Sequence, residues 1–225
     1  MGRMTVSEIA GLEDVTIVAG IERDGHPEIG TFIESIPIIA NSDDLPEADV
    51  WLDFSFASPA VEHVRQAAVI GKPVLLATTG YSIAELEELQ ELSKHCPVLM
   101  ASNLSAGVGV LESISMQAAR MLPTSFEAGI FELHHIAKKD SPSGTALRLA
   151  ERIAEYAPRP GIASMRAGGA IGEHQVRFVG VNEELVLIHR AWSRRAFSSG
   201  IERALKFIVK QPAGYYMTQD IYSVE

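Results

Sequence analysis

The sequence predicts an α/β protein made of a doubly wound parallel sheet and an α+β region with an open, mainly antiparallel sheet. In residues 1–103 short apolar runs alternate with helical patterns, which is typical of parallel strands joined by helices. Beyond residue 104, strands with alternating outward and inward residues follow with few helices between them. We therefore predict two domains, one formed by residues 1–103 and 194–225 and the other by residues 104–193.

Composition limits the class of protein. The 225 residues are 47% hydrophobic, enough for a sizeable core in two modest domains. The single Cys96 rules out an internal disulfide, and no apolar run has membrane-spanning length. With no basic leader before an apolar segment, we expect a cytoplasmic protein without a membrane partner. The net charge of −10 argues against a nucleic-acid partner.

The first part of the chain shows repeated strand-and-helix alternation. Met4 to Ala10 is expected to form a short helix, and the Val- and Ile-rich run from Val15 to Ile21 a strand buried on both faces. The elements expected next are a strand at 50–54, a helix at 60–70, a strand at 73–78, a helix at 83–95 and a strand at 98–101. This order is that of a Rossmann-like, doubly wound sheet.

In such sheets ligands bind in the loops at the carboxyl ends of the strands. Those loops here are Asp53–Ser55, Ala77–Tyr81 and Ala101–Leu104, in which small and hydroxyl residues dominate. Backbone groups with Thr or Asn side chains are suited to lining a nucleotide pocket. Taken singly, each loop is better explained as ordinary turn chemistry.

The second part begins with a helix from about Gly107 to Met121 and a strand from Phe126 to Leu133. A helix follows Gly144, because Ala146, Leu149, Ala150 and Ile153 recur on one helical face. Later segments are expected as strands at 162–167, 174–179 and 185–192, a helix at 197–209, and a return to the first domain at 215–222.

Polar residues concentrate in the loop between the strand ending at Leu133 and the helix after Gly144. His134, His135 and Lys138 are proton donors whose pKa values respond to burial and to a carboxylate such as Glu132 or Asp140. Each residue alone is better explained as part of a strand end or a solvated turn, but the whole set of residues is not. Metal binding is the other alternative, but adjacent strand residues point to opposite faces and no third His or Cys lies at ligand spacing.

The same loop has the residues of a helix start. Pro142 ends any earlier helix, Ser143 is an N-cap residue, and Gly144 allows the backbone to approach a ligand closely. The first-turn amides are then available to an anion. We expect an acidic substrate to bind there, beside the proton donors.

At this point the sequence resembles a known family. The string Glu-x-His-His, two residues, Lys, then Asp-x-Pro-Ser-Gly-Thr-Ala, from Glu132 to Ala146, is similar to the signature of bacterial 4-hydroxy-tetrahydrodipicolinate (dihydrodipicolinate) reductases. The resemblance implies NADPH- or NADH-dependent reduction of a cyclic dicarboxylate to tetrahydrodipicolinate, in the diaminopimelate and lysine pathway. It implies that His134 and Lys138 transfer protons.

The resemblance also implies substrate-binding roles for His135, Ser143, Gly144 and Thr145, and no metal. Family motifs near the substrate are similar to Arg166–Gly169, Gly172–His174 and Ser193–Arg194. The residues expected at the cofactor are Gly2, Arg3, Met4, Glu22, Arg23, Ala77, Thr78, Thr79, Ala101, Ser102, Asn103 and Leu104. Ala77 and Ser102 depart from the family's Gly-Thr-Thr-Gly and Ala-Ala-Asn-Phe loops.

Within the cofactor set, Glu22 is placed to bind the adenosine ribose hydroxyls and Arg23 to meet a 2′-phosphate. Together they indicate tolerance of both NADH and NADPH. A Glu-Arg pair in a turn is otherwise ordinary solvated surface.

The family begins with a strand and a glycine-rich turn ending in Gly-Arg-Met-Gly, whereas here the chain starts Met1-Gly2-Arg3-Met4-Thr5. The missing piece would supply the central strand and the amides that bind pyrophosphate. We therefore expect either a misassigned start or a shortened protein that binds NADPH poorly, with an unpaired edge at Val15 to Ile21.

Three functions remain open from the sequence. The first is the reductase, built as a homotetramer around the second domain, whose sheet has too few helices to cover both faces. The second is a non-catalytic, dicarboxylate-binding oligomeric subunit that has lost its cofactor. The third is another oxidoreductase on the same nucleotide fold, which requires the motif from His134 to Thr145 to be coincidental.

Overall fold

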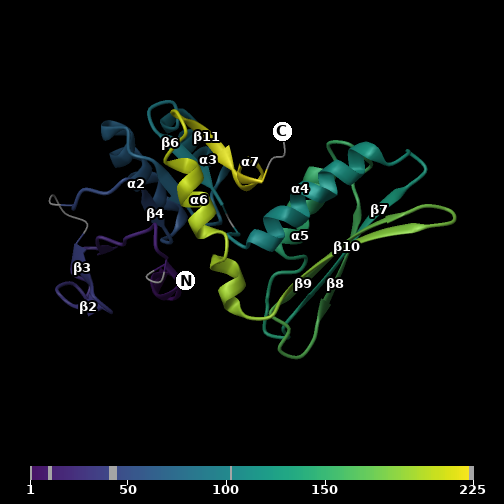
Figure 1. Ribbon diagram of the computed structural model, residues 1–225, viewed down its shortest axis with the longest axis horizontal. Coiled ribbons are helices and arrows are strands. Elements are labelled where there is room, and N and C mark those ends of the chain that lie inside the picture. The colour runs from purple at the N-terminus through teal and green to yellow at the C-terminus, as the bar shows by residue number, and fades with distance from the viewer. Residues whose placement is uncertain (1, 10–11, 41–44, 102, 223–225) are drawn as a thin grey trace. The chain divides into compact units, whose positions relative to one another are not determined.

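The computed structural model describes residues 2–9, 12–40, 45–101 and 103–222. The chain forms two compact units: Met1–Leu104 with Ser198–Ile221, and Ser105–Phe197 with Tyr222–Glu225. Figure 1 shows each unit with its own sheets and helices. Among the described helices, none is both long enough and apolar enough to span a membrane.

A four-stranded parallel sheet is the centre of the first unit. Its order is β11 (Gly214–Met217), β6 (Pro97–Met100), β5 (Val74–Leu76) and β4 (Trp51–Asp53). Helices α2 (Ala57–Ile70) and α3 (Ile83–Leu92) pack with it around a core that includes Val64, Val74, Leu89 and Val98. The helices and strands expected between residues 50 and 101 are thus confirmed, with small shifts at their ends.

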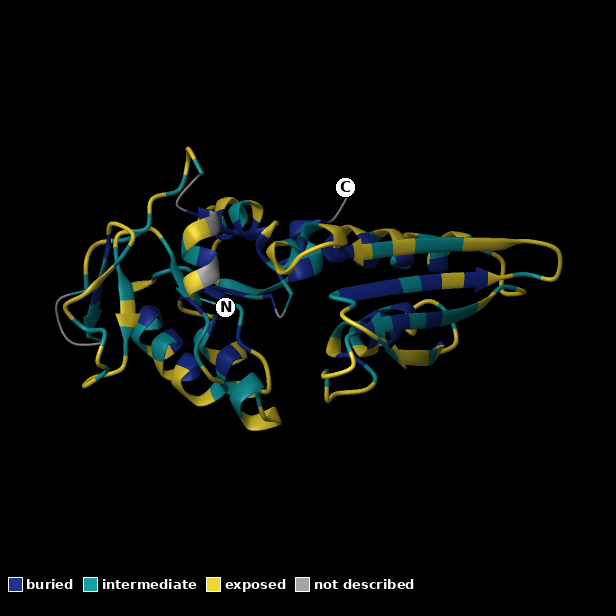
Figure 2. Cartoon of the chain, turned by 90° about the horizontal axis from the view of Figure 1, so that it is seen from below, coloured by how far each residue is buried: buried dark blue, intermediate teal, exposed yellow. Residues whose placement is uncertain are grey.

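Local signals explain where these helices begin and end. Gly71 stops α2 in the left-handed conformation, with φ of 66°, which glycine adopts without strain. Ser82 and Glu85 form a reciprocal capping box at the start of α3. Figure 2 shows the result along these helices, with buried residues on one side and exposed residues on the other.

A second, smaller sheet corrects one expectation. The strand predicted from Val15 to Ile21 is present only as β1 (Gly20–Glu22). It pairs in parallel with β3 (Ile36–Ala40), and β3 pairs with β2 (Phe32–Ile33). Residues 15–19 have no partner strand among the described residues, and Val18 is 42% exposed. An apolar run alone does not make a strand, because backbone groups need a neighbour to pair with.

The N-terminal helix α1 (Gly2–Ile9) begins two residues before the predicted start at Met4. The predicted last residue, Ala10, lies outside the described residues. The sequence analysis missed β2 and β3 altogether, since Pro37 within β3 and glycine nearby are not typical strand residues.

The second unit is built on a mixed sheet in the order β10 (Glu184–Ala191), β9 (Gly172–Val179), β7 (Glu127–His134) and β8 (Gly161–Arg166). Three strands are antiparallel neighbours, while β7 and β8 are parallel and connected through α5 (Gly144–Ile153). Helices α4 (Ala106–Met121) and α5 pack side by side against the sheet (Figure 1). Their shared core includes Ile130, Leu149, Val176 and Phe178.

One predicted helix is wrong at its start. The segment from Phe197 to Val209 is divided into a 3₁₀ helix, η1 (Arg194–Ser198), and α6 (Ile201–Ile208), with Gly200 as the N-cap of α6. Ser198, Ser199 and Gly200 favour caps and turns over a helix interior, which explains the break. The segment at 215–222 forms β11 and α7 (Thr218–Ile221).

Candidate active site

The polar cluster predicted from the sequence lies at the carboxyl end of β7 and the start of α5. Glu132 and His134 are two residues apart in β7 and therefore point to the same face, the one packed under the helices. Glu132 is 0% exposed and His134 is 7% exposed. The register places Glu132 beside Ser164 of β8 and His174 of β9, so three strands supply one row of polar residues.

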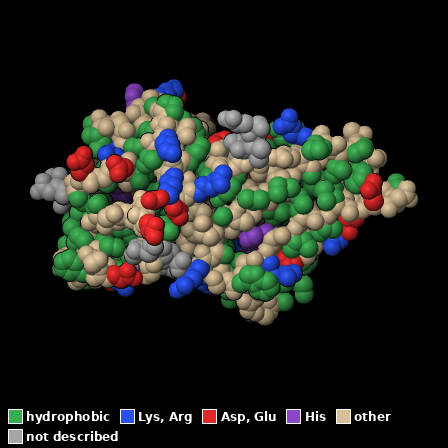
Figure 3. Space-filling model, viewed as in Figure 1, with side chains coloured by type: hydrophobic (Ala, Val, Ile, Leu, Met, Phe, Trp, Pro, Cys, Tyr) green, Lys and Arg blue, Asp and Glu red, His purple; other side chains and the backbone are tan. Residues whose placement is uncertain are grey.

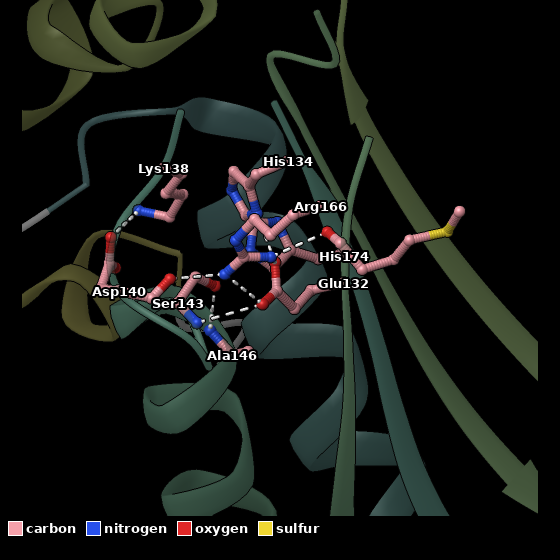
Figure 4. A network of polar contacts seen from close by, with 9 residues as sticks. Glu132, His134, Lys138, Asp140, Ser143, Ala146, Arg166 and His174 are labelled. Atoms are coloured by element: carbon pink, nitrogen blue, oxygen red, sulfur yellow. Dashed lines mark hydrogen bonds and ion pairs between the residues drawn. The ribbon is translucent and has the colours of Figure 1, made fainter. Parts of the chain in front are cut away.

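Glu132 is the centre of a hydrogen-bond network (Figure 4). Its Oε2 accepts from His134 Nδ1 and from Arg166 Nη1, the latter at 2.9 Å. Its Oε1 lies 2.8 Å from Arg166 Nη2 and accepts from the Ser143 amide at 3.3 Å. The Arg166 guanidinium thus grips both carboxylate oxygens, which is the bidentate geometry of strong Arg–carboxylate pairs.

Lys138 lies in the turn that follows β7, with a half-buried side chain. Its Nζ is 2.8 Å from Asp140 Oδ1. Arg166 reaches the same turn, since its Nη2 donates to the Asp140 carbonyl at 2.6 Å. The loop between β7 and α5 is therefore tied to β8 through one guanidinium.

Ser143 is the N-cap of α5, as the sequence predicts. Its Oγ accepts from the Ala146 amide at 3.2 Å and contacts His174 Nε2 at 3.1 Å. These two contacts fix the Ser143 hydroxyl between the first turn of α5 and the His174 ring. The amides of Gly144 and Thr145 lie in the first turn of α5.

The buried groups have shifted pKa values. Burial acts to raise the pKa of Glu132, but hydrogen bonds from Arg166, Ser164 and His134 outweigh it and lower that pKa to about 2. Burial lowers the pKa of His134, against the opposing effect of Glu132, and lowers the pKa of His174 to about 3. Resting His134 is therefore a neutral imidazole next to a carboxylate.

The structure brings the predicted substrate residues together in one segment. His135 directly follows the last residue of β7 and is half-buried. Gly144 is exposed, and no other atom lies within 4 Å of the place a Cβ would occupy. Arg166 and His174 join the network from β8 and β9. The sequence named them only as parts of motifs, because partners far apart along the chain have no local signal.

The predicted cofactor loops of the first unit lie side by side. Parallel pairing sets the ends of β4, β5 and β6 at one edge of the sheet, where the Ala77 amide bonds to the Asp53 carbonyl at 2.9 Å and the Ala101 amide to the Leu76 carbonyl at 2.8 Å. Thr78 is buried and Thr79 exposed, while Asn103 and Leu104 follow Ala101 in the next loop.

Asp53 holds this edge together, whereas the sequence named it only as part of a candidate ligand loop. Its Oδ1 accepts from the Ser55 amide at 2.8 Å, the Ser55 hydroxyl at 2.7 Å and the Thr78 hydroxyl at 2.9 Å, while His63 of α2 contacts Oδ2. Burial acts to raise the pKa of Asp53, but these hydrogen bonds outweigh it and the pKa is lowered.

The other predicted cofactor residues lie on different elements. Glu22 ends β1 and is half-buried, Arg23 is exposed, and Arg3 in α1 forms an ion pair with Glu28. Gly2 is the first residue of α1. Ser102 and the Met4 side chain lie outside the described residues.

Two further features of a possible site are metal-ligand clusters and patches of like charge. Within the part of the chain that the structure describes, no group of three His, Cys, Asp or Glu residues is arranged to hold a metal ion. In the view of Figure 3 the basic side chains are scattered among acidic ones and form no broad patch.

Comparison with known proteins identifies the family. Residues 1–104 match the family model described as dihydrodipicolinate reductase, N-terminus, and residues 107–222 match the model of its C-terminus. The chain is 35% identical to the 4-hydroxy-tetrahydrodipicolinate reductase of Syntrophobacter fumaroxidans, covering 96% of this chain and 92% of the relative. It is 34% identical to the reductase of the same name from Caldanaerobacter subterraneus, with 98% and 93% covered.

A solved structure agrees with the fold. The dipicolinate-bound dihydrodipicolinate reductase from Paenisporosarcina sp. superposes with a TM-score of 0.81 at 21% identity, covering 96% of this chain and 92% of that one. Sequence models over both halves, relatives over nearly the full length and the shared α/β fold point the same way. The chain belongs to the dihydrodipicolinate reductase family.

Proposed function

We propose that the chain reduces 4-hydroxy-tetrahydrodipicolinate to tetrahydrodipicolinate with NAD(P)H. One substrate, one NAD(P)H and one proton give one product, one NAD(P)⁺ and one water. The observation that carries the proposal is that His134 at the end of β7, Lys138 in the loop after it and the N-terminus of α5 follow one another in a single short segment. A proton donor and an anion-binding helix end at the same place suit a ring that bears carboxylates.

Binding of the substrate explains how His134 becomes a proton donor. Burial lowers the pKa of His134 in the resting protein, so its imidazole is mostly neutral. A bound dicarboxylate brings two negative charges near the ring, and opposite charge raises the pKa of a histidine. His134 then carries the proton that a ring carbon receives, and Lys138 is positioned to share this task from the same loop.

The remaining loop residues hold the substrate. The first-turn amides at Gly144 and Thr145 are aimed at one carboxylate, with Ser143 fixing the helix start and His135 adding a further contact. The Paenisporosarcina reductase holds dipicolinate, a ring with two carboxylates, which supports this class of ligand.

The first unit has the features needed for a nicotinamide cofactor. The adjoining loops at residues 77–79 and 101–104 follow β5 and β6 at the carboxyl edge of the parallel sheet. Gly80 has φ of 86°, with open space where a Cβ would lie. Bound there, NAD(P)H supplies the hydride. We propose that Glu22 binds the ribose and that Arg23 meets the 2′-phosphate of NADPH, so that both cofactors are accepted.

The test is an absorbance assay of NADPH oxidation by the purified 225-residue chain, supplied with the product of dihydrodipicolinate synthase. Activity should fall by roughly 10²–10⁴-fold in His134→Gln and comparably in Lys138→Ala. His95→Gln is the matched control, since His95 is exposed in the turn before β6. Unchanged turnover in both His134→Gln and Lys138→Ala contradicts the assignment.

The alternative, a non-catalytic subunit that binds the dicarboxylate, makes a different prediction. Dipicolinate would then bind, as measured by calorimetry, while NADPH would be neither bound nor oxidised. The two measurements made on one preparation separate the two functions.

The uncovered face of the second unit's sheet supports assembly. The face away from α4 and α5 carries Ile188 and Met165, which are 54% and 48% exposed. Apolar side chains on a sheet face are typical of subunit interfaces. We propose a homotetramer, in the cytoplasm, with a light-scattering mass near four times the 24.4 kDa of one chain. Ile188→Lys should reduce that mass, and an unchanged mass would place the interface elsewhere.

A further inference from the structure

We propose that Glu132 is a positioning residue for proton transfer. Its carboxylate holds the His134 ring with Nδ1–H directed at Glu132, so that the proton given to the substrate leaves from Nε2. The inference rests on the proposed function in one respect, that His134 donates a proton to the substrate. No part of the reaction requires Glu132 to touch the substrate.

The chemistry of a carboxylate fixes the first half of the proposal. Hydrogen bonds from Arg166, Ser164 and His134 lower the pKa of Glu132 to about 2, so it is ionised and accepts only. His134 Nδ1 lies in hydrogen-bond contact with Oε2 and therefore carries the hydrogen. The second ring nitrogen, Nε2, is therefore the atom that gains and loses the transferred proton.

Glu132 is also rigidly held. It is 0% exposed, both oxygens are gripped by Arg166, and Oε1 in addition accepts from the Ser143 amide. A carboxylate with these bonds cannot rotate without breaking several of them, so the imidazole it binds is fixed as well. This is the support that a proton donor needs to keep one geometry from substrate binding to transfer.

The surroundings of Nε2 complete the arrangement. Gly172 of β9 lies against the ring, and a Cβ at that position would come within 3.2 Å of Nε2. The His174 ring meets His134 edge-on at 5.1 Å between centroids, but its own Nε2 is bonded to Ser143. The absence of a side chain at Gly172 thus leaves Nε2 uncrowded, while His174 Nε2 has Ser143 as its partner.

The charged and titratable groups around His134 come from every strand and loop packed against it. Glu132 on β7 favours the protonated ring, while Lys138 in the loop and Arg166 on β8 oppose it. His174 on β9 is neutral, and His189 on β10 is a more distant neighbour of His174. Asp140 in the loop is a second carboxylate, but it is paired with Lys138. Glu132 is the carboxylate bonded to the ring, so its removal should make the imidazolium less stable.

The same carboxylate joins the two halves of the site. Its Oε1 holds the Ser143 amide at the N-cap of α5, while Oε2 holds His134. An anion bound by the first turn of α5 and the donor that protonates the ring are therefore anchored to one rigid group. During transfer the Nε2–H bond breaks, the new bond forms at the substrate carbon, and the electron pair left at Nε2 restores the neutral ring.

The first experiment needs neither substrate nor cofactor. Nitrogen NMR of histidine-labelled protein at pH 8 reports which ring nitrogen carries hydrogen, and His134→Gln identifies the His134 signal. The wild type should show hydrogen at Nδ1, whereas Glu132→Gln, whose neutral amide both donates and accepts, should show a mixture or hydrogen at Nε2. An unchanged Nδ1–H signal in Glu132→Gln overturns the proposal even if the enzyme is inactive for other reasons.

The second experiment measures kinetics. Glu132→Gln should lower kcat by roughly 10- to 100-fold, the loss expected for a charge-assisted hydrogen bond, with KM changed less than threefold. When kcat/KM of Glu132→Gln is plotted against pH, the alkaline limb should lie at lower pH than in the wild type, because loss of the carboxylate lowers the pKa of His134. Glu132→Asp, which keeps the charge, should recover part of the rate.

A matched control separates positioning from loss of stability. Glu112 is another buried carboxylate of the second unit, lying 3.1 Å from Arg148 Nε on α5. Glu112→Gln should lower stability without moving the pH profile. Identical profile shifts in Glu112→Gln and Glu132→Gln would overturn the role of Glu132, whereas no turnover in the wild type would contradict the proposed function alone.

Discussion

Acid should destabilise the second unit through His174, and His174→Gln should remove much of that effect. His174 is 4% exposed, and burial lowers its pKa to about 3 from an ordinary 6.5. A histidine whose pKa is lowered by folding takes up a proton in the unfolded chain first. The contribution of the neutral, buried His174 to the free energy of unfolding is therefore fully present above pH 6.5 and is lost as the pH falls from 6.5 toward 3.

The magnitude follows from the size of the shift. Each pH unit in that window costs 1.36 kcal/mol, so lowering the pH from 6.5 to 4.5 should cost the wild type about 2.7 kcal/mol from this residue. That is a large fraction of the ~5–15 kcal/mol of a typical domain. His174→Gln retains an acceptor for the Ser143 hydroxyl but does not titrate.

The assay is urea unfolding, followed by circular dichroism, from pH 8 to 4.5 on wild type and variant. The variant should be less stable at pH 8 because of its altered packing, and the difference should shrink by about 1.4 kcal/mol for each pH unit below 6.5. Taking the difference cancels titrations that both proteins share, including that of Glu132. Parallel stability curves for the two proteins would refute the reasoning.

Three further predictions follow from the two units. Thr145→Val should mainly raise KM for the dicarboxylate, because a hydrogen bond made equally in ground and transition states is uniform binding, and wild-type KM would place the anion elsewhere. Arg23→Ala should weaken NADPH more than NADH in calorimetry, and equal losses would count against a 2′-phosphate at Arg23. Asp53→Asn should lower the free energy of unfolding by about 1–3 kcal/mol and weaken NADPH binding, because Thr78 and Ser55 lose a charged acceptor. An unaltered affinity for NADPH would show that Asp53 has no influence on the cofactor loops.

The fold could be predicted where local signals agree with tertiary pairing. Ser82 with Glu85 and Gly71 mark ends of helices by their own chemistry, and the structure confirms both helices there. The strand predicted from Val15 to Ile21 was wrong over most of its length, because a strand needs a neighbouring strand to pair with. The sequence of one segment does not show whether such a neighbour is present. Gly200 divided a predicted helix for the opposite reason, since a strong local breaker was overlooked.

The candidate site divides along the same line. The motif from Glu132 to Ala146 correctly predicted a strand end, a loop and a helix start, because β7, the loop and α5 are contiguous. The roles of Arg166 and His174 depend on the strand order, which sets them beside Glu132 across β8 and β9. The Asp53 network is of the same kind, since its partner Thr78 comes from the next strand of the sheet.

The parallel pair β7–β8, joined through α5, has a consequence for how the protein acquires its chemistry. Glu132, His134, Lys138, Ser143 and Arg166 all come from this one crossover, within residues 127–166. The loop-closure entropy of a segment grows only slowly with its length, so one crossover can hold all five residues together at a modest entropic cost. The charged centre therefore depends on one connected segment of the chain, and His174 is added to it from β9, the strand on the other side of β7.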